Sequence, residues 1–306
     1  MMTTSHDTDF LVGPDEMPTT RVHPMAWSVR RELWENRSIY LAPLAVAAVF
    51  LCGFVMSTIT LPRRTRALLK LDAAHQRAAI VQPYDSVAIV LILTALIVAV
   101  FYCLDALHGE RRDRSILFWK SLPVSDRITV LSKATIPLLI LPAFIFVIVV
   151  VAQLAMLLWS SFVLLVNGLS PATTWAHFNV VIQSLVLLYG LIALSLWHAP
   201  IFAWLLLISV WARRAALLWA VLPPLAIAGV EKIAFGSTHF ASLLKDRVAG
   251  FASSAFAFNG KDVTIDSLTQ LSPGKFLSSP SLWIGLCFAA ICLAAAVRLR
   301  RNREPI

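Results

Sequence analysis

The chain has 306 residues, of which 58% are hydrophobic and 14% are charged, and its mean hydropathy is +0.77. A soluble domain normally carries about 25% charged and about 45–50% apolar residues, so the composition excludes an ordinary soluble fold. The net charge of +9 does not indicate nucleic-acid binding, because no basic stripe with interleaved aromatic residues marks a soluble segment. Cytoplasmic loops of membrane proteins are rich in Lys and Arg, and this accounts for the basic balance.

Charged residues are absent from long stretches of the sequence. The longest stretch, 134–212, contains 79 residues without Asp, Glu, Lys or Arg, and a turn-forming sequence from Asn167 to Pro171 divides it into two. About 20 apolar residues in a helix cross the ~30 Å core of a bilayer. The predicted fold class is therefore an all-α integral membrane protein with six transmembrane helices, at 38–61, 86–107, 135–166, 178–211, 215–230 and 281–297.

Polar and proline residues inside the predicted spans suggest local features. Pro200 predicts a kink in the fourth span, and Pro223 with Pro224 predicts a sharp bend in the short fifth span. That fifth segment either crosses the membrane in a bent form or only re-enters it. The uncharged polar residues inside spans are expected to bond neighbouring helices; they are Gln153, Gln183, Ser184 and Ser195.

The distribution of Lys and Arg predicts the orientation of the chain. With both termini in the cytoplasm, the cytoplasmic segments carry 16 Lys and Arg residues and the outer segments carry 10, as the positive-inside rule favours. The expected division is a disordered cytoplasmic N-terminus at 1–24, a membrane domain at 25–300 and a basic cytoplasmic tail at 301–306. Arg63, Arg64 and Arg66 in the first outer loop run against the rule, and an amphipathic helix on the outer surface is the one interpretation the residues offer.

Residues 25–37, before the first span, predict an amphipathic helix. Trp27, Leu33 and Trp34 fall on one arc of such a helix, whereas Arg31 and Glu32 fall on the other. Tryptophan with basic residues is typical of helices that lie in the headgroup region of a membrane. The helix is therefore either a general membrane-surface anchor or an anchor that also contacts a cytosolic partner.

The segment from His108 to Ser125 joins the second and third spans and has an ordered composition. Charges of both signs from Glu110 to Arg114 precede apolar residues that end at Trp119, and Pro123 then interrupts the chain. Ser125 is a favourable N-cap for the following helix. These residues predict a short helix on the cytoplasmic face, although an ordinary basic loop is the simpler alternative.

The stretch from Leu107 to Lys133 reads Gly-Glu-Arg-Arg-Asp-Arg-Ser-Ile and then Trp-Lys-Ser-Leu-Pro-Val-Ser-Asp. On these residues the chain resembles the ABC-2 type transporter permease family of bacterial exporters, over about residues 25–300. The resemblance implies a cytosolic connecting helix containing Trp27, Arg31 and Trp34. It also implies a coupling element that docks on a separate ATPase subunit, formed by Glu110, Arg111, Arg112, Asp113, Arg114 and Ser115. The residues expected to anchor that element are Trp119, Leu122, Pro123 and Val124.

The resemblance implies a permease subunit of an ATP-driven exporter in the bacterial inner membrane. Its partners would be an ABC ATP-binding subunit, a second permease chain, identical or different, and membrane lipids, with no nucleic acid. The sequence contains no GxxxxGK[ST] phosphate loop, so the chain is expected not to be an enzyme and to bind no cofactor, with ATP and Mg²⁺ on the partner subunit. The alternatives are a secondary transporter driven by an ion gradient and a membrane scaffold that transports nothing.

Overall fold

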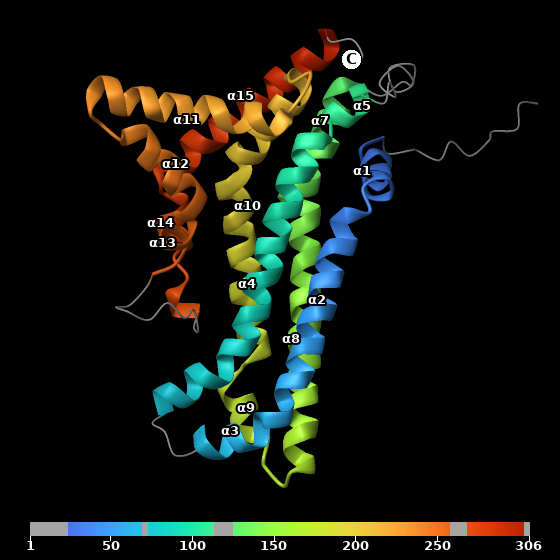
Figure 1. The fold of residues 1–306 in the computed structure, drawn as a ribbon, viewed down its shortest axis with the longest axis vertical. Coiled ribbons are helices and arrows are strands. Elements are labelled where there is room, and N and C mark those ends of the chain that lie inside the picture. Colours follow the sequence, from blue (N-terminus) through green and yellow to red (C-terminus); the bar gives the residue numbers. More distant parts are fainter. Residues whose placement is uncertain (1–23, 69–72, 113–124, 258–267, 303–306) are drawn as a thin grey trace, which may run out of the picture.

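The computed structural model describes residues 24–68, 73–112, 125–257 and 268–302, which are almost entirely helical (Figure 1). Of the predicted disordered segment 1–24, residues 1–23 lie outside the described residues, and Pro24 is the first residue of a helix. The greater part of the predicted coupling element and residues 303–306 also lie outside the described residues. The helices are α1 Pro24–Glu35, α2 Ser38–Ser57, α3 Leu61–Leu68, α4 Ala73–Asp105, α5 His108–Arg112, α7 Asp126–Thr135, α8 Leu141–Val166, α9 Ala172–His177, α10 Val180–Trp211, α11 Ala216–Phe235, α12 His239–Ala249, α13 Phe251–Ala255, α14 Pro273–Leu277 and α15 Pro280–Asn302. Short 3₁₀ turns, η1 Thr58–Thr60 and η3 Leu268–Gln270, and one π-helical turn, η2 Ile136–Ile140, complete the described elements.

Six helical segments in the described part of the chain are long and apolar enough to cross a membrane. Each of the six predicted spans overlaps one of them, so the prediction of a multi-pass helical membrane protein is confirmed at that level. The third segment runs continuously from Asp126 to Val166, because a π turn joins α7 to α8. Pro137 lies in that turn and lacks the N–H that an α-helical bond would require.

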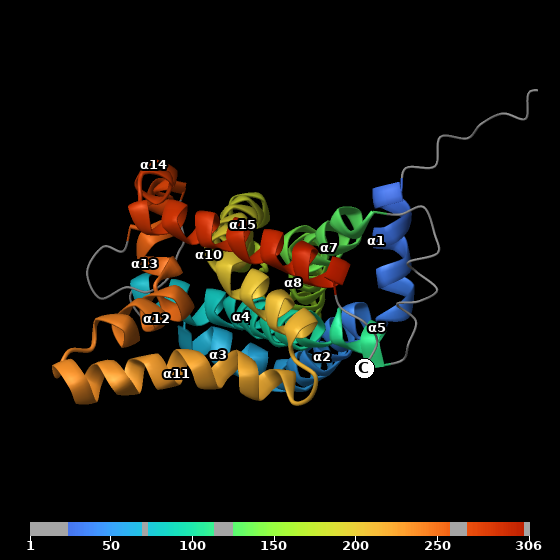
Figure 2. The ribbon, with the colours of Figure 1, turned by 90° about the horizontal axis from the view of Figure 1, so that it is seen from above.

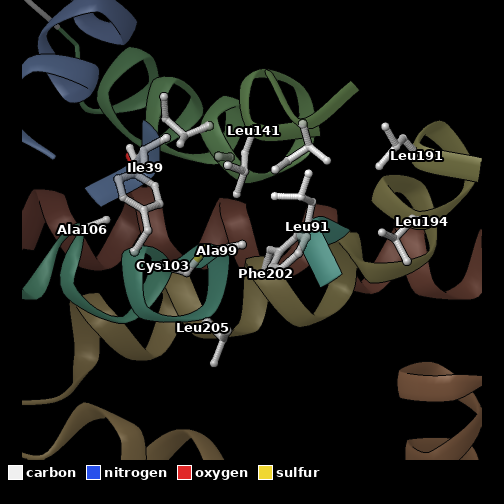
Figure 3. Close-up of a cluster of buried hydrophobic side chains, with 14 of the residues drawn as sticks. Ile39, Leu91, Ala99, Cys103, Ala106, Leu141, Leu191, Leu194, Phe202 and Leu205 are labelled. Atoms are coloured by element: carbon white, nitrogen blue, oxygen red, sulfur yellow. The ribbon is translucent and has the colours of Figure 1, made fainter. Parts of the chain in front are cut away.

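Helices α2, α4, α8 and α10 form a bundle along the long axis of the molecule, and α15 packs along α10 (Figure 1). The core between them combines Ile39 of α2, Leu91 and Cys103 of α4, Leu141 of α8 and Phe202 of α10 (Figure 3). Alanine residues are interspersed among these larger side chains. Small residues of this kind let helices approach closely, which matters in lipid, where apolar burial alone gives little driving force.

Polar side chains inside the bundle connect its helices. Gln153 of α8 donates to the carbonyl oxygen of Tyr84 on α4 at 3.1 Å, and Gln183 of α10 donates to Asp85 Oδ1 at 3.1 Å. Both glutamines therefore bridge helices as predicted. The prediction was wrong for Ser195, whose hydroxyl donates to the Leu191 carbonyl of its own helix at 2.8 Å.

Tryptophans mark both ends of the bundle. Trp159 near the end of α8 and Trp175 in α9 are partly exposed at one end, and Trp27 and Trp34 of α1 are exposed at the other. Tryptophan concentrates at the two membrane–water interfaces of a membrane protein. The two sets therefore fit the two headgroup levels of a bilayer that surrounds the bundle, with large exposed apolar side chains between them.

The C-terminal third departs from a simple row of spans. Helix α10 continues through Pro200, and α11 continues through Pro223 and Pro224, so the predicted bends do not interrupt either helix. Figures 1 and 2 show α11 running across the long axis of the bundle, rather than along it.

The segment between α11 and α15 was expected to be an outer loop, but it packs against the middle of α10. Trp197, near the midpoint of α10, donates to the carbonyl oxygen of Asp246 in α12 at 3.2 Å and lies 4.6 Å beneath the Arg247 guanidinium. Tyr189 donates to the Ala255 carbonyl at 2.9 Å. These bonds satisfy polar groups of α12 and α13 beside an otherwise apolar helix.

The core packing makes a direct prediction at Leu206 of α10, which is fully buried. Leu206→Ala should lower the free energy of unfolding in detergent by about 2 kcal/mol, the lower end of the usual range for this change, because lipid-like surroundings remove much of the transfer contribution. Ile192→Ala on the same helix is the control, since Ile192 is 54% exposed. Equal melting temperatures for the two variants would contradict the assignment of the core.

Candidate functional site

A cluster of charged side chains and one tyrosine lies, largely buried, at the end of the bundle where α1 and α5 lie. We call it the polar cluster, and its members are Arg31, Glu32, Tyr102, Glu110, Asp126, Lys133 and Arg300. They come from α1, α4, α5, α7 and α15, and the partners are separated in sequence by as many as 190 residues. The cluster therefore exists only in the folded chain.

Lys133 lies at the centre of the polar cluster and is 2% exposed. Its Nζ atom is 2.8 Å from Glu32 Oε1 and 3.1 Å from Glu110 Oε1. Glu32 has no exposed surface, and its second oxygen accepts a hydrogen bond of 2.9 Å from the Tyr102 hydroxyl. Both carboxylates are thus compensated by donors, as buried charges must be.

Glu110 is the residue with the widest connections in the cluster. Its Oε1 atom also lies 3.1 Å from Arg31 Nη2, and its Oε2 atom accepts a 2.8 Å bond from Arg300 Nη1. Arg300 then reaches Asp126 Oδ1 through its Nε atom at 3.0 Å. Through its contacts with Arg31, Lys133 and Arg300, one carboxylate joins α5 to α1, α7 and α15.

The formal charges of the polar cluster balance, with three cations, Arg31, Lys133 and Arg300, against three carboxylates, Glu32, Glu110 and Asp126. Glu35 lies at its edge, 3.4 Å from Arg31 Nε, and is about half exposed. Burial raises the pKa of the Glu35 carboxyl, and the nearby charge of Arg31 opposes that shift. A balanced, fully paired group can remain buried, whereas removal of one member leaves an uncompensated charge.

A second set of bonds fastens α5 to the C-terminal end of α10. The Ser209 hydroxyl accepts bonds from the backbone N–H groups of Leu107 and His108 at 3.0 and 2.9 Å. Arg111 Nη1 donates to the Val210 carbonyl at 2.6 Å and to the Ala212 carbonyl at 3.4 Å. The last carbonyls of a helix have no partner within it, and Arg111 supplies donors for two at this end of α10.

The residues assigned to the coupling element by resemblance therefore fall into three groups. Glu110 and Arg111 are buried within this chain, and Arg112 is exposed. The remaining residues lie outside the described part of the structure; they are Asp113, Arg114, Ser115, Trp119, Leu122, Pro123 and Val124.

The residues assigned to the connecting helix fall into two groups, one exposed and one facing the polar cluster. Trp27 and Trp34 are 45% and 67% exposed, and the Arg30 guanidinium stacks 4.7 Å from the Trp34 ring. Arg31 turns inward to the polar cluster, and the buried residues of α1 are Ser28 and Glu32. The face of α1 that packs on the protein thus combines Ser28 and Glu32 with Val29 and Leu33, whereas the two tryptophans are exposed. The predicted arc is wrong for Leu33, which packs on the core instead of lying with the tryptophans.

Five members of the polar cluster were not identified as site residues from the sequence: Glu32, Tyr102, Asp126, Lys133 and Arg300. Lys133 carries the clearest signal, because it is a single cation next to 79 uncharged residues. Nothing in the sequence distinguishes Arg300 from the other arginines at the end of the last span. The pairing between them depends on tertiary contacts that no local pattern reveals.

No group of three metal-binding side chains occurs in the part of the chain that the structure describes. Comparisons of this chain with protein families, with curated proteins and with solved structures found no match.

The polar cluster makes a prediction at Lys133. Lys133→Met should lower the free energy of unfolding by about 3–5 kcal/mol, because Glu32 and Glu110 lose a buried partner. Unfolding in a denaturing detergent would measure the loss, with Lys245→Met, at an exposed lysine of α12, as the control. The double variant Glu32→Gln with Lys133→Met should recover part of the loss, since it removes one uncompensated charge. A Lys133→Met protein as stable as the control would contradict the cluster.

Proposed function

We propose that this chain is the membrane-spanning permease subunit of an ATP-driven ABC export system and that it forms the translocation pathway. The observation that carries the proposal is the position of Glu110. This residue begins the segment that resembles the coupling element of ABC-2 permeases, and it is also the buried carboxylate that joins α5 to three other helices. The absence of a phosphate loop from the sequence assigns ATP hydrolysis to a separate subunit.

In this proposal the polar cluster transmits movement. A partner that displaces the segment after Arg112 pulls on α5, whose Glu110 and Arg111 are bonded to α1, α7, α15 and the end of α10. Separation of any of these buried charges from its partner is costly, so the helix ends move together. ATP binding on the partner then biases a two-state equilibrium of the bundle between inward-facing and outward-facing forms.

The burial of Glu110 and Arg111 changes the roles that the resemblance suggested for them. Contact with the ATPase falls to Arg112, which is exposed at the end of α5, and to the residues that follow it. Glu110 and Arg111 instead hold α5 against the bundle. Reversal of the charge at Arg111 would remove a donor from the Val210 carbonyl of α10 and from the Ala212 carbonyl just after it. Its effect would therefore combine a loss of stability with a loss of docking.

Helix α1 serves as an interfacial connecting helix, because Trp27 and Trp34 are exposed on it while another face packs on the protein. The end with the polar cluster faces the cytoplasm of a bacterial cell, with the bundle in the inner membrane. Helix α11 is apolar and almost wholly exposed within this chain, which suits contact with lipid and with a second permease chain.

Charge reversal at Arg112 tests the proposal. Arg112→Glu should insert normally but lower co-purification of the ATPase subunit, and the ATP hydrolysis that accompanies it, by about tenfold, since a charged docking contact of about 1.4 kcal/mol is lost. The measurement is the ATPase activity of the tagged chain purified in mild detergent from its native membrane. Arg214→Glu, at an exposed residue between α10 and α11, is the control.

Three other outcomes decide the assignment. Normal co-purification and transport with Arg112→Glu would show that the docking surface lies elsewhere. If intact wild-type preparations contain no ATPase, the chain is instead a secondary transporter or a scaffold. Dependence of substrate uptake on an ion gradient would then separate those two.

A further inference from the structure

Helix α3 carries Arg63, Arg64 and Arg66 and has no acidic residue, and nothing in the proposed export function explains it. It lies with α9 at the end of the bundle opposite to α1 (Figure 1). It contacts both α4 and α8. The cluster of arginines is thus placed at a defined position on the bundle.

A cavity of about 100 Å³ opens beneath α3. Residues from α2, η1, α3, α4, α8 and the segment around α9 line it: Phe54, Ser57, Thr58, Leu61, Arg64, Thr65, Gln76, Ala79, Ile80, Pro83, Tyr84, Ser160, Leu164, Thr173 and Thr174. Among the described residues of this lining, Arg64 is the one that is charged, and neither Arg63 nor Arg66 belongs to it. The three neighbouring arginines are therefore not equivalent.

The side chains that surround Arg64 in the cavity are mostly uncharged hydroxyl-bearing or apolar residues. The hydroxyls of Ser57, Thr58 and Ser160 donate to carbonyl oxygens of their own helices at 2.7, 2.6 and 3.0 Å. They therefore offer little hydrogen-bond donation to a ligand. Phe54 and Leu164 add apolar surface. A ligand that enters thus meets the positive charge of Arg64, apolar side chains, hydroxyls that are already bonded, and a few other polar residues such as Thr65 and Thr173.

The size and the level of the cavity restrict the ligand. Sites for whole small molecules usually measure about 300–1,000 Å³, so a cavity of about 100 Å³ receives a part of a molecule. Trp159 donates to the Thr58 hydroxyl in the cavity wall at 3.1 Å, and Trp175 donates to Ser161 at 2.9 Å. Partly exposed tryptophans of this kind lie at headgroup level.

We propose that this cavity binds the phosphodiester head group of an anionic membrane phospholipid, with Arg64 as its charge partner. The acyl chains stay outside, against exposed apolar residues at the same end of the bundle such as Ile59 of η1 and Phe162 of α8. A phosphate ester matches a guanidinium in both charge and geometry. The surrounding apolar walls favour the attachment of that ester to a lipid over a free phosphate in water.

Lipid binding to the purified full chain tests the proposal. Native mass spectrometry in detergent, with added dioleoylphosphatidylglycerol, should detect one tightly retained lipid per chain. Arg64→Gln should weaken that binding about tenfold or more, because a charge-assisted contact is lost. Arg66→Gln, on the same helix but outside the cavity, should change it less than about twofold, and Arg64→Lys should retain part of the affinity.

A cavity-filling variant gives a second, independent measurement. Ala79→Phe should displace the same lipid while Arg64 is still present, because Ala79 lines the cavity. Melting temperatures in lipid-free detergent show whether each variant is folded. A folded Ala79→Phe protein that keeps the wild-type lipid affinity would overturn the proposal.

Three further results would assign the binding to another cause. Equal losses for Arg64→Gln and Arg66→Gln would assign the attraction to the general charge of α3 and overturn the site. Equal retention of dioleoylphosphatidylcholine would show that the net charge of the lipid is not recognised, and would also overturn it. Binding of glycerol 3-phosphate as tight as that of the lipid, and lost in Arg64→Gln, would assign the cavity to soluble phosphate esters instead.

Discussion

Charges withdrawn from water must find partners, and at one end of this bundle that constraint determines which helix ends meet. Lys133 enters the interior from α7, where it has almost no exposed surface, and two carboxylates from α1 and α5 surround it. Glu110 also pairs with Arg31 of α1 and with Arg300 of α15. Because a missing partner would cost several kcal/mol, the ends of these elements are held in one arrangement.

Apolar packing alone would specify the bundle much less well. Lipid tails are as apolar as the core side chains, so helices in a membrane gain little from burying leucine. Specific polar contacts therefore matter within the bundle too, such as the bond between the Tyr84 and Ser160 hydroxyls at 3.1 Å and the one from Gln153 to the Tyr84 carbonyl. They fix the axial position of α4 against α8, and small residues such as Ala99 let the helices approach closely (Figure 3).

The positively charged side chains at the two ends of the bundle have different surroundings. At the α1 end, Arg31, Lys133 and Arg300 turn inward and are neutralised by carboxylates of the same chain. At the α3 end, Arg63, Arg64 and Arg66 belong to a helix without an acidic residue. The first arrangement suits a rigid connection between helices. The second suits attraction of an anion from outside the chain, and a membrane supplies such anions as lipid head groups.

The sequence alone determined the all-helical class of the protein and the positions of its six long apolar helices. Uncharged stretches of about 20 residues fit few structures other than membrane spans, and each predicted span overlaps a long apolar helix. The turn after Val166 was also predictable, since Asn, Gly and Pro concentrate there and Gly168 adopts a positive φ of 71°. These features depend on local chemistry and on hydropathy, which a sequence displays directly.

Only the tertiary structure decided which polar residues face inward. Glu110 and Arg112 are two positions apart in one charged segment, yet the first is buried and the second exposed. Arg300 belongs to a basic cluster at the chain end, and the contacts between α15 and α7 select it for burial. The prolines of α11 did not interrupt that helix, and Figures 1 and 2 show that it runs across the bundle. Burial of a charge depends on partners as many as 190 residues away, and no local pattern contains that information.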